Sequence, residues 1–569
     1  MSAPAASTEA PVPSCGSKST GTCGRASDPA PKGWGSFHSE REDERVEVLI
    51  RKPESEYKPP ALAVPLDAWW RAFPVPGSEA AAATDSSPAV VPFGAETKRA
   101  LFHLEPSWAF LNHGAFGAAL RPVVAAARAW HDRMEAQPLR FIDREMLPLL
   151  VYVTRETAKY FNAPALDVVM LANATTGLNT VFRSLGLRAG ERVATLDLGY
   201  GATDKMLKHV CAEAGAVHDR IGIPLPVPSV KALVGAVKRY FIRHRPARPE
   251  GKSAEAEGDG AGAAAKDGSA AGTKDDDAGS AGDALVDASG NAVTAVFGQD
   301  VLPVRRGTAR DGGVRLLVLD YVNSNSGVRL PLAELIAACR AEGVEVLVDG
   351  AHCWGSLEVD LAAIKPTYFV ANAHKWLCAS KGCAMLYVAP AAQAGIVPLN
   401  ISHGHGGGFT SSFTWTGLQD YGPWLALLTA FDFWRRAGPE RLRGYIHSTV
   451  LAGARLLCER WGTELIAPEE MMLPMATVRL PGPRVPRSGS EHTQLQDALH
   501  FRFGVEAPVR MLNNRLYVRV SAHIYTDLSE FERLADAMLE LRPRLSAEED
   551  EADKEAAENA EVVKPDSGC

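Results

Sequence analysis

The sequence predicts an α/β protein with a mostly parallel central sheet and a smaller α+β domain at the C-terminus. Between about residues 167 and 376, short apolar runs alternate with helical patterns. This alternation is typical of parallel strands that are buried on both faces. Hydrophobic residues make up 46% of the 569-residue chain and charged residues 22%, which is enough apolar side chain for a large core.

The elements of the α/β part follow in a regular order along the chain. Apolar runs predict strands at 167–171, 192–196, 315–320, 344–349 and directly before Lys375. Helical spacing of apolar residues predicts helices at 176–185, 203–214 and 332–342. The C-terminal part reverses this order, with helices at 425–436 and 450–461, strands at 475–480 and 516–520, and a closing helix at 529–541.

Composition divides the chain into domains and low-complexity segments. Residues 1–95 are expected to form a disordered leader, 96–422 a large α/β domain, 423–545 a small α+β domain and 546–569 an acidic disordered tail. Residues 251–284 contain no aliphatic residue larger than alanine, no methionine and no aromatic residue, so they cannot bury apolar surface. We interpret them as a disordered surface insertion within the large domain.

Charge and cysteine usage exclude several classes of function. The formal net charge is −8, and the tail from residue 547 holds nine acids and two lysines, so the rest of the chain is nearly neutral. We therefore expect no nucleic-acid partner and, without a long apolar run, no membrane span. Nine scattered cysteines without a C-x-x-C pair favour a reducing, cytoplasmic location. The Ser-, Ala- and Pro-rich residues 1–35 leave organelle targeting open.

Two polar residues stand at the ends of predicted strands. Asp349 ends a fully apolar strand, and a buried carboxylate needs a partner such as a protonated heterocycle. Lys375 follows another strand, between His374 and Trp376, and a desolvated lysine becomes a nucleophile towards carbonyls. Taken singly, Asp349 could cap a helix and Lys375 could be a surface residue. Because neighbouring parallel strands end at one edge, both would reach the same site.

A third segment, Asn173–Gly177, follows a strand and opens a helix. Backbone N–H groups at a helix N-terminus, together with threonine hydroxyls, suit a phosphate, although a plain threonine cap would leave the same pattern. The chain has no P-loop and no dinucleotide-binding fingerprint, so a nucleotide is not indicated. A phosphate cradle, an acid for a ring nitrogen and a reactive lysine together describe a site for pyridoxal 5′-phosphate (PLP).

These motifs resemble fold-type I PLP-dependent enzymes of aminotransferase class V. Within that class the chain resembles the isopenicillin N epimerase-like group, which also includes cysteine desulfhydrase-like C–S lyases. The resemblance covers about residues 101–541 without the insertion, and segments 111–117 and 137–145 are similar to the group's entry segment. It implies the PLP-dependent transferase type I fold.

The resemblance also assigns roles to individual residues. It implies that Lys375 binds the cofactor's aldehyde, that Asp349 holds the ring nitrogen and that His352 bonds the phenolic oxygen, and these three would be catalytic. The remaining predicted positions are Ala174, Thr175 and His374 at the phosphate, Tyr200 stacked on the ring, Thr416 reaching the phosphate of a neighbouring subunit in a homodimer, Arg519 on the substrate α-carboxylate, and Asn112, Ser324 and Asn325 in the substrate pocket.

Three of these assignments have simpler alternatives. Tyr200 could pack on the core, Arg519 could pair with Glu506 or Asp527, and Thr416 could cap a helix. His403 and His405 could bind a metal, but no carboxylate or thiol cluster accompanies them, so we expect no metal and interpret this glycine-rich loop as a flexible lid.

The implied activity is removal of the α-proton from an amino acid. The loop at 400–409 contains no cysteine that could carry sulfur as a persulfide. The sequence therefore predicts a C–S lyase resembling cysteine desulfhydrase, with an amino-acid epimerase or an aminotransferase as the alternative. A catalytically inactive scaffold with the same fold is the alternative from outside the enzymes.

Overall fold

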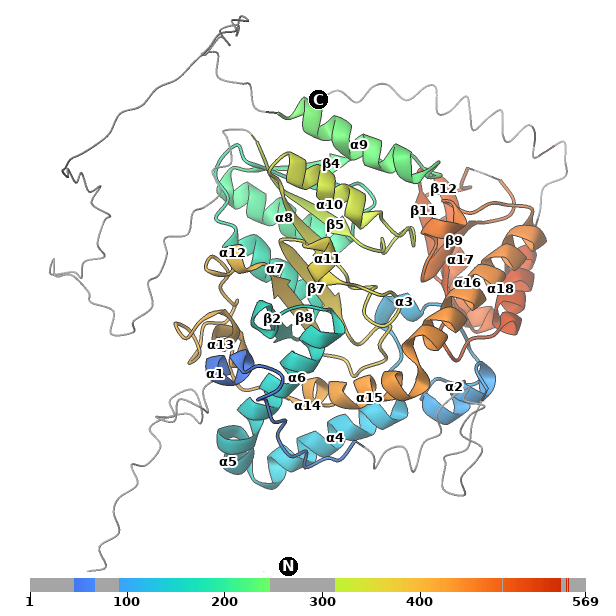
Figure 1. The fold of residues 1–569 in the computed structure, drawn as a ribbon. Coiled ribbons are helices and arrows are strands. Elements are labelled where there is room, and N and C mark those ends of the chain that lie inside the picture. Colours follow the sequence, from blue (N-terminus) through green and yellow to red (C-terminus); the bar gives the residue numbers. More distant parts are fainter. Residues whose placement is uncertain are drawn as a thin grey trace, which may run out of the picture.

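The structure is a computed structural model that describes residues 46–66, 92–245, 313–483 and 485–543, together with Glu549 and Glu551 (Figure 1). The predicted insertion at 251–284, most of the predicted leader and nearly all of the predicted tail lie outside these residues. Within the described residues, no helix combines the length and apolarity needed to cross a membrane.

A seven-stranded sheet forms the centre of the molecule, in the order β2-β8-β7-β6-β5-β3-β4. The strands β4, β3, β5, β6 and β7 run parallel, while β8 is antiparallel to both β7 and β2. The predicted α/β fold with a mostly parallel sheet is therefore confirmed. The strands are β2 (Val168–Leu171), β3 (Arg192–Leu196), β4 (Val217–Ile221), β5 (Val314–Asp320), β6 (Glu345–Asp349), β7 (Tyr368–Asn372) and β8 (Ala384–Val388).

Helices cover both faces of this sheet, as Figure 1 shows. Alternate residues of every strand except β4 enter two separate apolar clusters, one with α7 and α8 and the other with α6, α9 and α10. The helices of this large unit are α1 (Val46–Arg51), α3 (His113–Phe116), α4 (Arg121–Ala136), α5 (Pro138–Arg140), α6 (Met146–Tyr160), α7 (Ala174–Ser184), α8 (Gly201–Ala214), α9 (Val230–Arg243), α10 (Leu332–Ala341), α11 (Leu361–Ile364), α12 (Pro390–Gln393), α13 (Phe409–Thr414), α14 (Gly422–Leu425) and α15 (Leu427–Ala437). Short helical turns occupy Phe141–Glu145, Ala165–Asp167 and Glu469–Met471.

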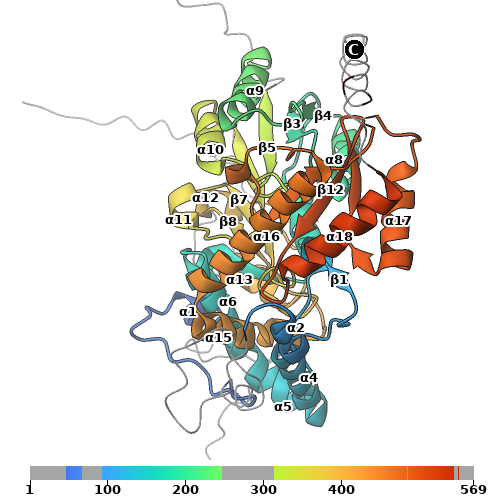
Figure 2. The ribbon, with the colours of Figure 1, turned by 90° about the vertical axis from the view of Figure 1, so that its right-hand side faces the viewer.

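A smaller three-stranded antiparallel sheet, β11-β12-β9, lies beside the large unit, with α16 and α18 lying across it (Figure 2). It confirms the α+β character predicted for the C-terminal part. Its elements are β9 (Met475–Arg479), β11 (Val509–Leu512), β12 (Arg515–Ser521), α16 (Pro439–Trp461), α17 (Glu491–Phe503) and α18 (Leu528–Leu541).

The chain crosses between the two units near both predicted domain boundaries. The early helix α2 (Ala95–Leu101) is tied to the small unit by an ion pair between Lys98 and Glu530. The short strand β1 (Ala109–Phe110) pairs with β10 (Val505–Glu506). In the other direction, α15 lies beyond the predicted boundary at residue 423 but packs on α4 and α6 and so belongs to the large unit. The division at residues 96 and 423 stays a prediction, and these contacts link both units tightly.

Two local features explain where the predicted elements shift. Helix α7 begins at Ala174, before the predicted Thr176, because the Asn173 side chain accepts a hydrogen bond from the Thr176 N–H and caps the helix. Strand β4 was not predicted, because its sequence Val-His-Asp-Arg-Ile carries the polar residues of a half-exposed edge strand.

Helix α16 offers a matched pair of glycines that tests this packing. A Cβ at Gly453 would lie 2.4 Å from the Phe531 ring, whereas a Cβ at Gly444 would meet nothing within 4 Å. We expect Gly453→Ala to destabilise the protein by about 1–3 kcal/mol through overpacking. Gly444→Ala should be neutral or stabilising by up to about 1 kcal/mol, because alanine favours the helix. Urea unfolding of both variants checks this, and equal effects would contradict the packing.

Candidate active site

A pocket opens at the carboxyl edge of the large sheet, with about 630 Å³ of empty space that is partly open to solvent. It brings together the three segments that the sequence singled out, at the ends of β2, β6 and β7. The polar residues that line it are Asn173, Thr175, Tyr200, Asp320, Ser324, Asp349, His352, Asn372, His374 and Lys375. The strand-end argument therefore placed Asp349 and Lys375 correctly beside the 173–177 turn.

Lys375 lies in the loop that joins β7 to β8 and points its amine at the pocket. Burial lowers the pKa of this amine to about 8, the charge of Asp349 acts in the opposite direction, and Arg519 lowers the pKa further. Lys375 forms no salt bridge with any described residue, and its Nζ lies 3.3 Å from His352 Nε2. A substantial fraction of the amine is therefore neutral near pH 8, which is the nucleophilic form.

Two buried carboxyl groups lie side by side at the ends of adjacent strands, because Asp320 of β5 is paired in register with Asp349 of β6. Burial raises the pKa of Asp349, while the Ala351 N–H, 2.9 Å away, and Lys375 oppose that rise. The pKa of Asp320 is raised well above its usual value by burial and then by the charge of Asp349. Asp320 thus holds a proton more readily, and Asp349 is the member available to a cationic ring nitrogen.

The beginning of α7 supplies the predicted phosphate corner. The Ala174 N–H already donates to Asn372 Oδ1 at 2.9 Å, and the Thr176 N–H donates to Asn173. The Thr175 hydroxyl faces the pocket without a hydrogen-bond partner among the described residues. At the same corner, His374 Nδ1 is buried and has no partner there. The Thr175 hydroxyl and His374 Nδ1 therefore remain available to an anion, whereas the Ala174 amide is already bonded.

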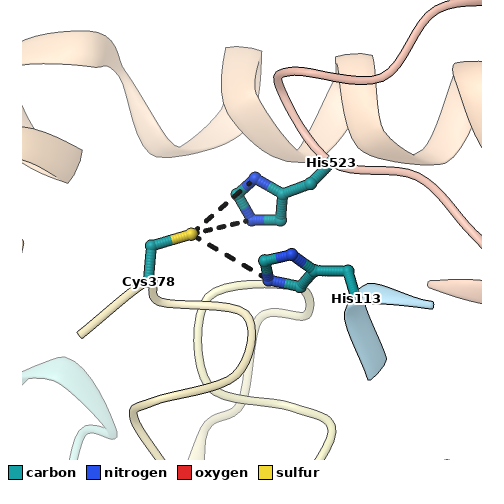
Figure 3. A group of neighbouring side chains, drawn as sticks. All are labelled: His113, Cys378 and His523. Atoms are coloured by element: carbon teal, nitrogen blue, oxygen red, sulfur yellow. Dashed lines mark hydrogen bonds between the residues drawn. The ribbon is translucent and has the colours of Figure 1, made fainter. Parts of the chain in front are cut away.

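Buried histidines hold the backbone of the lysine loop in place. His113 Nε2 lies 2.9 Å from the Lys375 carbonyl oxygen and His523 Nε2 lies 3.0 Å from the Trp376 carbonyl oxygen. Figure 3 shows both rings beside the Cys378 thiol. Each imidazole uses its Nε2–H on a carbonyl, and burial raises the pKa of the thiol. This cluster is thus hydrogen-bonded as it stands, and it positions the loop that carries Lys375.

Arg519 projects from β12 into the contact between the two units. Its guanidinium donates to Asn112 Oδ1 at 2.8 Å and to the Ser324 carbonyl oxygen. The alternative pairing is wrong, because Glu506 bonds Asn112 and His500, and Asp527 caps α18. Arg519 is 3% exposed and has no acidic partner among the described residues. Burial of such a cation costs free energy, which a bound anion would offset.

The remaining predicted residues differ in how close they lie to the pocket. Tyr200 lines it, is 42% exposed and precedes α8. The Asn325 amide instead donates to the carbonyl oxygens of Leu198 and Gly199, so it supports the loop that carries Tyr200. Thr416 does not line the pocket of its own chain, and its predicted role across a subunit interface stays a prediction. The same holds for the lid formed by the 400–409 loop.

Sequence reasoning missed residues whose signals were weak. Asp320 ends an apolar strand just as Asp349 does, and that repeated pattern could have identified it. Asn372 and His113 gave no signal, because their roles depend on hydrogen bonds to distant backbone atoms. Near His403 and His405 the described residues contain no metal-compatible cluster, since the one such group is His113, Cys378 and His523.

The unpaired groups of the pocket match PLP chemically. Asp349 is a buried acceptor for a protonated ring nitrogen, and Lys375 is a partly neutral amine for an aldehyde. The Thr175 hydroxyl and the orphaned His374 Nδ1 provide donors for a phosphate. Each of these groups has a complementary group on PLP, and they have few hydrogen-bond or ion-pair partners within the chain. The pocket residues therefore fit this cofactor.

Comparisons with known proteins agree with this geometry. Residues 308–417 match the family model described as aminotransferase class-V. A probable chloroplastic L-cysteine desulfhydrase from Arabidopsis thaliana is 26% identical over 77% of this chain and 83% of its own length. An isopenicillin N epimerase from Streptomyces clavuligerus is 26% identical over 78% of this chain and 97% of its own.

Solved structures share the fold at lower identity. A complex of the cystine C–S lyase C-DES has a TM-score of 0.55 at 16% identity, covering 76% of this chain and 97% of that one. An apo cysteine desulfurase from Thermococcus onnurineus NA1 has a TM-score of 0.57 at 15% identity, covering 79% and 98%. The fold and the pocket together define a PLP-dependent enzyme of the type I fold. Its residues 308–417 are similar to aminotransferase class V, and the relatives that it resembles in sequence include cysteine desulfhydrases and isopenicillin N epimerases.

The lowered pKa of Lys375 predicts how cofactor capture depends on pH. With a pKa of about 8 the amine is protonated below that pH and neutral above it, so PLP capture by cofactor-free protein should accelerate as pH rises and level off above pH 8. At pH 7 the neutral fraction is about 300 times that of an ordinary lysine. Stopped-flow absorbance over a pH series measures this. A midpoint near that of free lysine would contradict the buried environment, and Lys375→Ala serves as the zero-rate control.

Proposed function

We propose that the protein is a PLP-dependent C–S lyase that eliminates a thiol from a cysteine-like amino acid. The observation that carries this proposal is a pocket that Lys375 and Asp349 line without a salt bridge between them. The buried Arg519, which has no acidic partner among the described residues, donates to the carbonyl oxygen of Ser324, another residue of the pocket lining. Cysteine desulfhydrases among the sequence relatives support the substrate class.

The chain's own residues would divide the work as follows. Lys375 would hold the cofactor's aldehyde, Asp349 its ring nitrogen, and Thr175 with His374 its phosphate. When bound, PLP supplies a conjugated ring that stabilises negative charge on the substrate's α-carbon. Because Asp349 lies next to the more easily protonated Asp320, its carboxylate keeps the charge needed to hold a proton on that ring nitrogen.

Lys375 Nζ would take up the α-proton. A base works best when its pKa lies near the operating pH, and burial lowers the pKa of this amine to about 8. Arg519 would orient the substrate by donating hydrogen bonds to its α-carboxylate, for which the planar guanidinium is suited. Burial and the neighbouring Arg510 lower the pKa of Arg519 to about 9, so a bound carboxylate would relieve an uncompensated cation.

Release of sulfur as a free thiol or sulfide is supported by the cysteines. Cys211, Cys339, Cys353, Cys378 and Cys383 are buried, and the partly buried Cys458 is not among the residues that line the pocket. Burial raises the pKa of Cys353 well above its usual value, which keeps this thiol protonated. Among the described residues no cysteine lines the pocket, so none is placed to accept sulfur as a persulfide.

Epimerisation is the second candidate, because two isopenicillin N epimerases at 26% and 28% identity are also relatives. It requires return of the proton to the opposite face of the α-carbon. Elimination and epimerisation both begin with removal of the α-proton, so both would use most of the same pocket residues. Substrate assays therefore separate them.

A substrate test follows directly. The protein loaded with PLP and incubated with L-cysteine should release sulfide and pyruvate. Lys375→Ala should lower the rate at least about 10³-fold, because the amine that would hold the cofactor's aldehyde and take up the α-proton is removed. Arg519→Lys should mainly raise KM, since one bidentate contact is lost. Sulfide release and chiral analysis of recovered amino acids are the measurements. A racemised substrate without sulfide would favour the epimerase, and an inactive protein with bound PLP would favour a scaffold.

We further propose a homodimer in which Thr416 reaches the partner's phosphate site, as the sequence resemblance implies. The exposed Leu418 beside it, 68% accessible, fits a surface that a second copy covers. The cytoplasmic location is likewise a proposal. The name of one chloroplastic relative makes residues 1–35 a segment to test for targeting.

Mixed dimers test the shared site. If Thr416 acts across the interface, Lys375→Ala and Thr416→Asp chains are each inactive, but a mixed dimer contains one intact site. Random mixing should then restore about a quarter of the wild-type activity. Activity after co-refolding or co-expression, with light scattering for mass, is the measurement. A monomeric mass, or mixtures that stay inactive, would contradict the proposal.

A further inference from the structure

We propose that Trp376 is a positioning residue that sets the direction of the hydrogen bond between His352 and Lys375. In this arrangement His352 donates and the Lys375 amine accepts, which favours the unprotonated form of the lysine. The inference deepens the proposed function and rests on its assignment of Lys375 as the reactive amine. It concerns a contact for which the sequence gave Trp376 no role.

The first step is the chemistry of the indole. Trp376 Nε1 lies 3.3 Å from His352 Nδ1, and an indole nitrogen can only donate. His352 Nδ1 must therefore accept this hydrogen bond and carry no proton. A neutral imidazole has one N–H, so the proton of His352 lies on Nε2.

The second step is the opposite side of the ring. His352 Nε2 lies 3.3 Å from Lys375 Nζ. With a proton on Nε2, the contact is favourable when Nζ offers its lone pair, and it is repulsive when Nζ is an ammonium with three donors. The indole thus biases the lysine towards its neutral form through the imidazole between them.

The surroundings keep the imidazole neutral. His352 is 3% exposed, and burial lowers its pKa well below the usual value. Protonation would place an N–H on Nδ1, directly against the indole N–H. The charged and titratable groups that act on His352 or Lys375 are Asp349, Asp320, Cys353, Arg519 and His113.

The indole itself has little freedom to turn away. Trp376 is fully buried, its carbonyl oxygen accepts from His523 Nε2 at 3.0 Å, and its ring centroid lies 5.2 Å from that of His113. The Trp376 indole N–H, which donates to His352, is therefore held in place by His523 and His113, the same histidines that hold the lysine loop.

The chain provides a matched control. Trp434 is also buried, and its Nε1 donates to the Leu377 carbonyl oxygen at 3.1 Å, two residues from Lys375. Trp434→Phe removes an indole hydrogen bond to the same loop without touching His352. Trp376→Phe removes the bond to His352. Replacement of Trp376 by 3-benzothienylalanine keeps the ring shape and deletes the N–H, in case phenylalanine leaves a cavity that prevents folding.

The experiment uses the full chain after removal of the cofactor. Long-range ¹H–¹⁵N spectra of the histidine rings, assigned with His352→Gln, report which nitrogen carries the proton. The pH midpoint of PLP capture reports the Lys375 pKa. We expect the wild type and Trp434→Phe to show the Nε2–H form. In both Trp376 variants the proton of His352 should move to Nδ1. The pH midpoint of PLP capture should rise by about one unit, so that at any pH below the midpoint about tenfold less Lys375 amine is neutral.

An unchanged tautomer and midpoint in the Trp376 variants, or an equal shift in Trp434→Phe, would overturn the proposal. Neither readout needs substrate or turnover. A protein that binds PLP with this tautomer but releases no sulfide would sink the proposed reaction and leave the positioning role intact.

Discussion

The burial of an amine beside a carboxyl group, without a salt bridge between them, is the constraint on which this structure depends. Lys375 and Asp349 lie at one edge of a sheet whose faces are both covered, so neither is solvated as it would be at the surface. Burial lowers the pKa of the lysine to about 8 and raises that of Asp349. Both pKa shifts favour the neutral forms, which cost less free energy to bury than the charged forms. Perturbed pKa values of this kind are typical of functional sites.

The small unit completes this edge. It supplies Arg519 from β12 and His523 from the following loop, and each reaches backbone or side-chain atoms of the large unit. Helix α2 and strand β1 in turn bind the early part of the chain to the small unit. Displacement of one unit against the other would therefore disturb both the Arg519 guanidinium and the backbone of the lysine loop.

Much of the fold could be predicted from local pattern. The strand at 192–196 was predicted with its observed bounds, and that ending at Asp349 with a difference of one residue, because continuous apolar runs are what a doubly covered sheet requires. The half-polar β4 was missed because an edge strand lacks this signal. At the site, strand-end positions singled out Lys375, Asp349 and the segment 173–177, and the structure places all three at one pocket. Asp320 was overlooked, although its position follows the same rule.

The sequence by itself determined the α/β alternation and which residue types end each strand, since these depend on neighbours a few positions away. The tertiary structure decided which polar atoms are hydrogen-bonded within the chain and which remain available to a ligand. It bonds the Ala174 amide to Asn372, leaves Thr175 free, and inserts His352 between Trp376 and Lys375. Such pairings join atoms far apart in sequence, and their energies depend on burial and direction, which periodicity does not encode.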